Sequence, residues 1–151
     1  MSSQFKPGAG YKEKVIESFN RQEMMKTIHA SILAIRPGEI ELEFPYQTNL
    51  TQQHGFIHAG IVSTVLDSAC GYAAFSLMPE NAAVLTIEFK INFLSPAKGD
   101  WFRAIGKVRK PGNVITVTEG ELFAHIEGGQ KLIATMVGTI MSVYNREGIE
   151  S

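Results

Sequence analysis

One carboxylate lies inside a long apolar stretch of the chain and is the first candidate for chemistry. Asp67 is the only side chain between Ala59 and Met78 that is normally charged at neutral pH. Moving a carboxylate out of water is costly unless it is paired, hydrogen-bonded or protonated. Burial also raises the pKa of such a group, which makes it a better general base near neutrality. Asp67 is therefore a candidate catalytic base; the alternative is a structural aspartate bonded by Ser63 or Ser68.

Two polar residues that precede this stretch could act on a carbonyl group. His58 comes directly before the expected helix, where free N–H groups and the positive end of the helix dipole can stabilise a developing oxyanion. Gln52 lies in the loop leading there, and its amide both donates and accepts hydrogen bonds. Each residue also has an ordinary role open to it, His58 as a helix cap and Gln52 as a solvated loop residue.

The spacing of His58 and Asp67 favours a site built by two subunits. Their nine-residue separation on a helix gives about 13 Å of rise and about half a turn of rotation. One small reacting group cannot contact both side chains of a single chain. A two-fold dimer with antiparallel helices at its interface would bring them together twice, so we expect a homodimer.

The elements that must position these residues follow from the apolar pattern. Residues 59 to 78 are apolar on all sides and predict a helix wrapped by other structure. A shorter amphipathic helix is predicted from Tyr11 to about Met25, followed by strands at 30–36 and 39–44 around the turn Pro37-Gly38. Four more strands are predicted at 83–94, 101–110, 114–126 and 131–144.

The first of these four strands alternates, which predicts one apolar face made of Leu85, Ile87, Phe89, Ile91 and Phe93. The order of the elements indicates an α+β fold in which a curved antiparallel sheet wraps around a long central helix.

Composition restricts the classes of function. The chain has 151 residues, the size of one domain, and its 14 basic and 15 acidic residues give a net charge of −1. The chain has no excess of positive charge, so we do not expect nucleic acid as a partner. The hydrophobic fraction of 44% is enough for a core and for a large subunit contact.

Cysteine and targeting signals favour a cytoplasmic protein that does not enter a membrane. Cys70 is the only cysteine, so no internal disulfide can form, and it is expected to be a core residue. The first residues have no apolar core of the signal-peptide type. His29, His54 and His125 are too scattered along the chain to suggest a metal site.

Three segments taken together resemble a known enzyme family. They are Gln52-Gln53-His54-Gly55-Phe56-Ile57-His58-Ala59-Gly60, then Asp67, then Asn92-Phe93-Leu94-Ser95-Pro96-Ala97. Their order and spacing resemble the hotdog-fold acyl-CoA thioesterases of the phenylacetate-degradation (PaaI-like) type, over about residues 20 to 144. The resemblance implies a hotdog fold, a tight dimer paired again into a tetramer, and hydrolysis of an acyl-CoA at the dimer interface. It implies no cofactor, because coenzyme A is part of the substrate.

The resemblance also implies roles for single residues. Asp67 matches the catalytic carboxylate of the family, which acts as general base or nucleophile. Gln52 matches an amide that positions the carbonyl or the water, and His58 matches the histidine that orients the thioester. The backbone N–H of Ala59 matches the oxyanion donor, and Thr86 matches the hydroxyl that holds the water.

The family commonly has His-Gly-Gly where this chain has His58-Ala59-Gly60. Gly60 keeps its place and is expected to contact the substrate. Alanine at the middle position is costly only if that residue needs a positive φ. For the nucleotide end of coenzyme A the candidates are Arg109, Lys110, Gly112 and Asn113, a pair of cations before a glycine turn, which a solvated turn explains equally well.

We expect an N-terminal leader and short helix in residues 1–20, a thioesterase domain in 21–145 and a tail in 146–151. The expected reaction converts an aryl- or medium-chain acyl-CoA to free acid and coenzyme A. Two alternatives are open: a hydratase or dehydratase on the same fold, and a non-catalytic acyl-CoA binding module.

Overall fold

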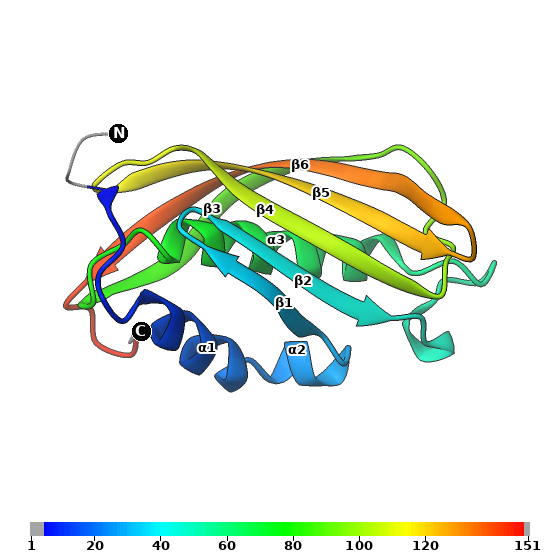
Figure 1. Cartoon of the computed structure of the whole chain (residues 1–151), viewed down its shortest axis with the longest axis horizontal. Coiled ribbons are helices and arrows are strands. Elements are labelled where there is room, and N and C mark those ends of the chain that lie inside the picture. The colour runs from blue at the N-terminus through cyan, green and yellow to red at the C-terminus, as the bar shows by residue number, and fades with distance from the viewer. Residues whose placement is uncertain (1–4, 150–151) are drawn as a thin grey trace.

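A single curved antiparallel sheet wraps around one long helix in the computed structural model, which describes residues 5–149. The six strands are β1 (Ser31–Arg36), β2 (Glu39–Pro45), β3 (Ala82–Phe93), β4 (Trp101–Lys110), β5 (Ile115–Ile126) and β6 (Gly129–Tyr144), arranged in the order β1-β2-β4-β5-β6-β3. The helix α3 (Ala59–Phe75) contacts every strand from β2 to β6 (Figure 1). The predicted fold class and hotdog architecture are confirmed.

The first predicted helix is divided in two at Gln22. The structure has α1 (Tyr11–Arg21) and α2 (Glu23–Thr27), and Gln22 between them has an extended ψ of 106°. Both helices lie beside β1 at the bottom of Figure 1. Val15 and Phe19 of α1 are buried in the same core as α3, so the expected boundary after residue 20 falls within a packed helix. Residues 1–4 of the expected leader and 150–151 of the expected tail lie outside the described residues.

Three glycines under α3 allow the helix to lie close against the sheet. Gly106 of β4 and Gly120 of β5 are direct cross-strand partners, and Gly138 of β6 pairs with Thr118, two residues before Gly120. A Cβ atom on Gly106 would overlap the backbone of Ala69, and one on Gly120 would lie 2.9 Å from Sγ of Cys70. Close contact between the helix and the bare backbone of the sheet therefore sets the height of α3.

Strand β3 contains a bulge that corrects one sequence prediction. Thr86 pairs with the buried Ile140, and Glu88 pairs with the next residue, Thr139, so Ile87 is an extra residue. Beyond the bulge the inward positions change from even to odd numbers, and Phe93 pairs with the buried Ala134. The single apolar face predicted for this strand is therefore wrong at Leu85, which lies on the opposite face from its neighbour Thr86.

The hairpin of β1 and β2 is confirmed, and its turn has Gly38 at a φ of 72°. Helix α3 starts where predicted and ends at Phe75, three residues early. Among the residues from 5 to 149, no helix combines the length and apolar character needed to cross a membrane.

Candidate active site

Asp67 lies on α3 with a hydroxyl partner from β3. Oγ1 of Thr86 donates a hydrogen bond of 2.7 Å to Oδ1 of Asp67. Burial raises the pKa of Asp67 and the hydrogen bond from Thr86 lowers it, with burial the larger effect. The serines considered as partners bond elsewhere, Ser63 to the carbonyl of Ala59 and Ser68 to Gln22. The carboxylate is thus half-buried and bonded by Thr86, the residue directly before the bulge in β3.

His58 caps the N-terminus of α3 and is fixed in one tautomer. Its Nδ1 accepts a hydrogen bond of 2.8 Å from the N–H of Gly60, so the ring proton of the neutral imidazole is on Nε2. His58 therefore has the ordinary role of a helix cap, and its Nε2–H group stays available as a donor to a ligand.

The amide of Ala59 is the helix-terminal donor without a partner. The N–H groups of Ile61 and Val62 bond to the carbonyl of His58, and Gly60 bonds to the His58 ring. No partner is found for the N–H of Ala59 among the described residues. Ala59 is not one of the non-glycine residues with positive φ. The methyl group at this position therefore causes no backbone strain, and the amide points out of the helix as an oxyanion donor requires.

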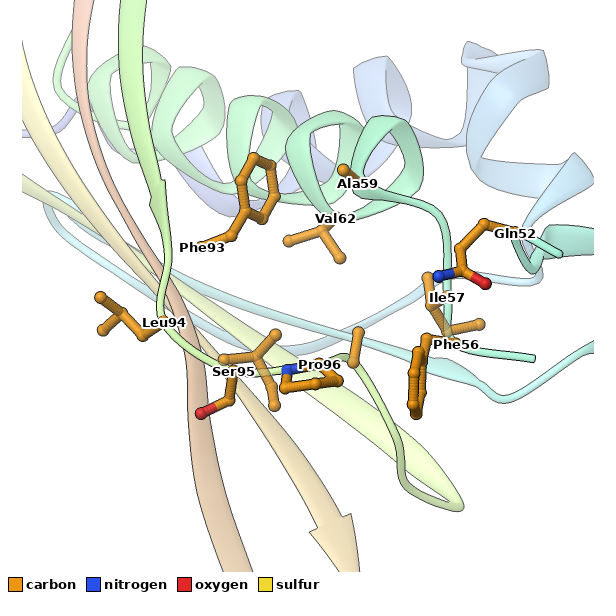
Figure 2. A pocket seen from close by; sticks show the side chains of 11 residues that line it. Gln52, Phe56, Ile57, Ala59, Val62, Phe93, Leu94, Ser95 and Pro96 are labelled. Carbon is orange, nitrogen blue, oxygen red and sulfur yellow. The ribbon is translucent and has the colours of Figure 1, made fainter. Parts of the chain in front are cut away.

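Gln52 lies at the rim of a mainly apolar cavity of about 480 Å³ (Figure 2). Ala59 and Val62 from the start of α3 line one side, and Phe93 and Leu94 from the end of β3 line another. Oε1 of Gln52 accepts the backbone N–H of His54, which turns the amide nitrogen toward the cavity in Figure 2. This cavity therefore has mainly apolar walls and offers donors to a carbonyl oxygen.

One chain does not unite these groups around one reacting atom. Asp67 and Thr86 line a different cavity of about 240 Å³, together with Gln22, Ser68 and Tyr72. Ala59 and Asp67 are on the same uninterrupted helix, about 12 Å apart along its axis. The separation predicted from the spacing is present in the structure.

The candidates for the nucleotide end of coenzyme A lie at the other end of α3. Nε of Arg109 is 3.1 Å from a carboxylate oxygen of Glu119. Gly112 and Asn113 line a small cavity of about 180 Å³ beside Met78, just beyond the C-terminus of α3. Lys110, the last residue of β4, precedes this turn. The structure does not bring these residues to Asp67 within one chain, and their role stays a prediction.

Burial raises the pKa of the Cys70 thiol to about 12, which agrees with a core residue. Among the described residues no group of three histidine, cysteine or acidic side chains could hold a metal ion.

Sequence reasoning missed the polar residues that surround Asp67 from other elements. Nε2 of Gln22 donates 2.9 Å to the hydroxyl of Tyr72, and Ser68 donates 3.3 Å to Oε1 of Gln22. Tyr72 was a usable signal, because a buried phenol in an apolar helix needs a hydrogen-bond partner. Its partner Gln22 lies 50 residues away in sequence and has no local signature.

Comparison with known proteins identifies the family of the chain. The profile of the thioesterase superfamily matches residues 54–128. A thioesterase family protein from Silicibacter pomeroyi has 56% sequence identity and a TM-score of 0.89, with 90% of this chain and all of that chain covered. A candidate esterase from Saccharolobus solfataricus is 31% identical over 128 residues, which cover 83% of this chain and 89% of that protein.

The PaaI protein of the phenylacetic acid degradation operon of E. coli has the same fold. Its TM-score is 0.81 at 20% identity, over 91% of this chain and 96% of that chain. The chain therefore belongs to the thioesterase superfamily, as a hotdog-fold hydrolase that acts on thioester bonds.

Proposed function

We propose that this protein hydrolyses an aryl- or medium-chain acyl-CoA to the free acid and coenzyme A, at sites shared between two copies of the chain. The observation that carries the proposal is the separation of Asp67 from the Ala59 amide and Gln52 into two cavities of one chain. A second copy related by a two-fold axis supplies the missing half of each site.

The free edge of β3 supports this assembly. β3 ends the strand order, and its partner strand β6 covers one side only. Ile87, Phe93 and the following Leu94 are 54%, 49% and 54% exposed. An edge strand with exposed apolar side chains invites pairing with another chain. Pairing of two copies along β3 would bury these side chains, of which Phe93 and Leu94 line the Gln52–Ala59 cavity, and a further pairing of dimers would give the expected tetramer.

In the proposed reaction a water molecule attacks the thioester carbonyl carbon. Asp67 takes one proton from this water, which Thr86 positions through its hydroxyl oxygen. The oxyanion is held by two groups from the partner chain, the backbone N–H at the position of Ala59 and the side-chain amide at the position of Gln52. Collapse of the tetrahedral intermediate breaks the C–S bond, and the thiolate of coenzyme A takes the proton from Asp67. A direct attack by the Asp67 carboxylate, followed by hydrolysis of the anhydride, uses the same groups.

Mixing two inactive variants tests the shared site. We expect Asp67→Asn and Gln52→Ala to lose most acyl-CoA hydrolysis when assayed alone, measured as release of free thiol. After subunit exchange, half of the dimers contain one intact site, so about a quarter of the wild-type activity should return. A mixture as inactive as its components would show that each site lies within one chain.

Product analysis by mass spectrometry addresses the alternative chemistry. Free acid and coenzyme A are expected, whereas a hydratase would yield a hydrated acyl-CoA with the thioester intact. Tight binding without release of thiol would instead favour the binding module.

A further inference from the structure

Two cavities next to α3 have three lining residues in common, among them one glutamine and one tyrosine. The first is the Asp67 cavity of about 240 Å³ described above. The second, which we call the outer cavity, has about 260 Å³ and is also lined by Ser18, Phe75 and Ile149. Gln22, Tyr72 and Val84 line both cavities. The side chains of Gln22 and Tyr72 therefore stand between the space beside the carboxylate and the space beyond it.

This wall is held by a small set of hydrogen bonds. Gln22 donates 2.9 Å to the hydroxyl of Tyr72, which also lies 3.2 Å from Oγ of Ser18. Ser68 donates 3.3 Å to Oε1 of Gln22. The break between α1 and α2 places Gln22 at this point, because its extended backbone ends one helix and begins the next. The wall is thus anchored on both the helix pair and α3.

We propose that the Gln22–Tyr72 pair forms the end wall of the acyl-binding cavity, limiting the acyl group to about eight non-hydrogen atoms and favouring a hydroxyl or carbonyl at its far end. This inference rests on the proposed thioester hydrolysis at Asp67. The limit follows from the volume of the Asp67 cavity, since a group the size of a water molecule occupies about 30 Å³.

The preference for a polar end follows from the groups that the wall presents. The Gln22 amide has a second N–H, and Oγ of Ser68 keeps its lone pairs after donating to Gln22. An acyl chain that ends in a hydroxyl or carbonyl can bond to these groups. A chain that ends in a methyl group removes water from them without replacing its hydrogen bonds, which is the kind of loss that gives strong discrimination.

The wall also explains why the outer cavity is separate. Its volume is similar to that of the Asp67 cavity, so removing the side chain of Gln22 would roughly double the space open to an acyl group. Besides the polar Ser18 and Arg21, its lining includes Phe75 and Ile149, which would contact a longer apolar chain.

The experiment compares kcat/KM of the full chain for straight acyl-CoAs from about four to about fourteen carbons, and for matched chains that end in a hydroxyl. For the wild type we expect a fall of about tenfold or more once the chain exceeds the volume limit. Gln22→Ala should move this limit to longer chains. Gln22→Leu, which keeps the wall nearly filled, should retain the limit and lose the preference for the hydroxyl-ended chains.

Two further variants separate the wall from general effects on folding. Tyr72→Phe removes only the hydroxyl, so we expect the length limit to stay and the polar preference to weaken. Gln47→Leu is the matched control, because its amide bonds to the carbonyl of Ile28 at the end of α2, away from both cavities. It should leave the length profile unchanged.

A wild-type rate that keeps rising through the longest chains would overturn the inference, as would an active Gln22→Ala enzyme with the wild-type length profile. In both cases hydrolysis persists, so thioester hydrolysis at Asp67 stands. A wild-type protein that hydrolyses no acyl-CoA would overturn the proposed function and the inference together.

Discussion

Replacement of Thr86 by valine removes the hydroxyl that donates to Asp67 and keeps the branched shape of the side chain. The bond of 2.7 Å favours the ionised carboxylate and opposes the effect of burial, which raises the pKa of Asp67. A hydrogen bond to a charged group is worth about 1.5–3 kcal/mol, and one pKa unit corresponds to about 1.4 kcal/mol. Because solvent reaches part of this pair, the lower end of the free-energy range applies to the Thr86–Asp67 bond. Loss of the bond should therefore move the titration of Asp67 by about one pH unit.

The expected result is a shift of the acidic limb of kcat/KM toward higher pH by about one unit. The ionised form of Asp67 is the base, so its loss on acidification begins at a higher pH in the variant. At pH values on the acidic limb, kcat/KM of the variant should be about tenfold lower than that of the wild type. This difference is in addition to any change in kcat/KM on the plateau at higher pH. The assay is thiol release from an acyl-CoA in samples quenched over a range of about pH 4 to pH 9.

Two control variants make this prediction specific. Thr86→Ser keeps the hydroxyl and should retain the wild-type limb. Thr64→Val is a matched change on α3, because the Thr64 hydroxyl donates its hydrogen bond to the carbonyl of Gly60 rather than to Asp67. If the acidic limb of Thr86→Val coincides with that of the wild type, Thr86 does not control the ionisation of the base, or Asp67 is not the base.

Three further predictions concern stability. Burial raises the pKa of Asp67 above its ordinary value of 3.8, so the folded state loses stability as the pH rises above 3.8. Asp67→Asn should therefore raise the melting temperature at neutral pH by roughly 2–4 °C, while it loses turnover. This gain in melting temperature should vanish below about pH 4. Gly106→Ala forces a Cβ into the backbone of Ala69 and should lower the free energy of unfolding by about 1–3 kcal/mol in chemical denaturation, whereas Gly8→Ala, with open space, should change it little. His29 is exposed at a φ of 56°, so His29→Gly should stabilise by about 0.5–1 kcal/mol, and more than Asn145→Gly at a φ of 49°, because asparagine tolerates that region. Each of the last two predictions compares two variants, Gly106→Ala with Gly8→Ala and His29→Gly with Asn145→Gly. A smaller or opposite difference in the free energy of unfolding within either pair would contradict the explanation from backbone packing and backbone conformation.

Local patterns predicted the elements that depend on neighbouring residues. The apolar run that becomes α3, its start at Ala59 and the turn at Gly38 are all readable within a few residues of sequence. The distance between His58 and Asp67 was predictable for the same reason, because a helix converts residue number directly into length. These features also carried the expectation of a shared site.

The bulge at Ile87 and the wall at Gln22 were not predictable in this way. Alternation in β3 continues through the bulge in sequence, and only its pairing with β6 shows where an extra residue is absorbed. The contact between Gln22 and Tyr72 joins residues far apart along the chain, and the ion pair of Arg109 with Glu119 crosses from β4 to β5. Tertiary contacts of this kind depend on the packed arrangement, which neither periodicity nor turn chemistry encodes.

The row of glycines under α3 has a consequence for how this scaffold can change. Contact between the backbone of the helix and the backbone of the sheet fixes the depth of Asp67, which lies two residues before Ala69. Main-chain atoms do not differ between amino acids, so exchanges of side chains around the two cavities leave that depth unaltered. Selection can therefore reshape the walls at Gln22, Tyr72 and the end of β3 for new acyl groups while the carboxylate keeps its place.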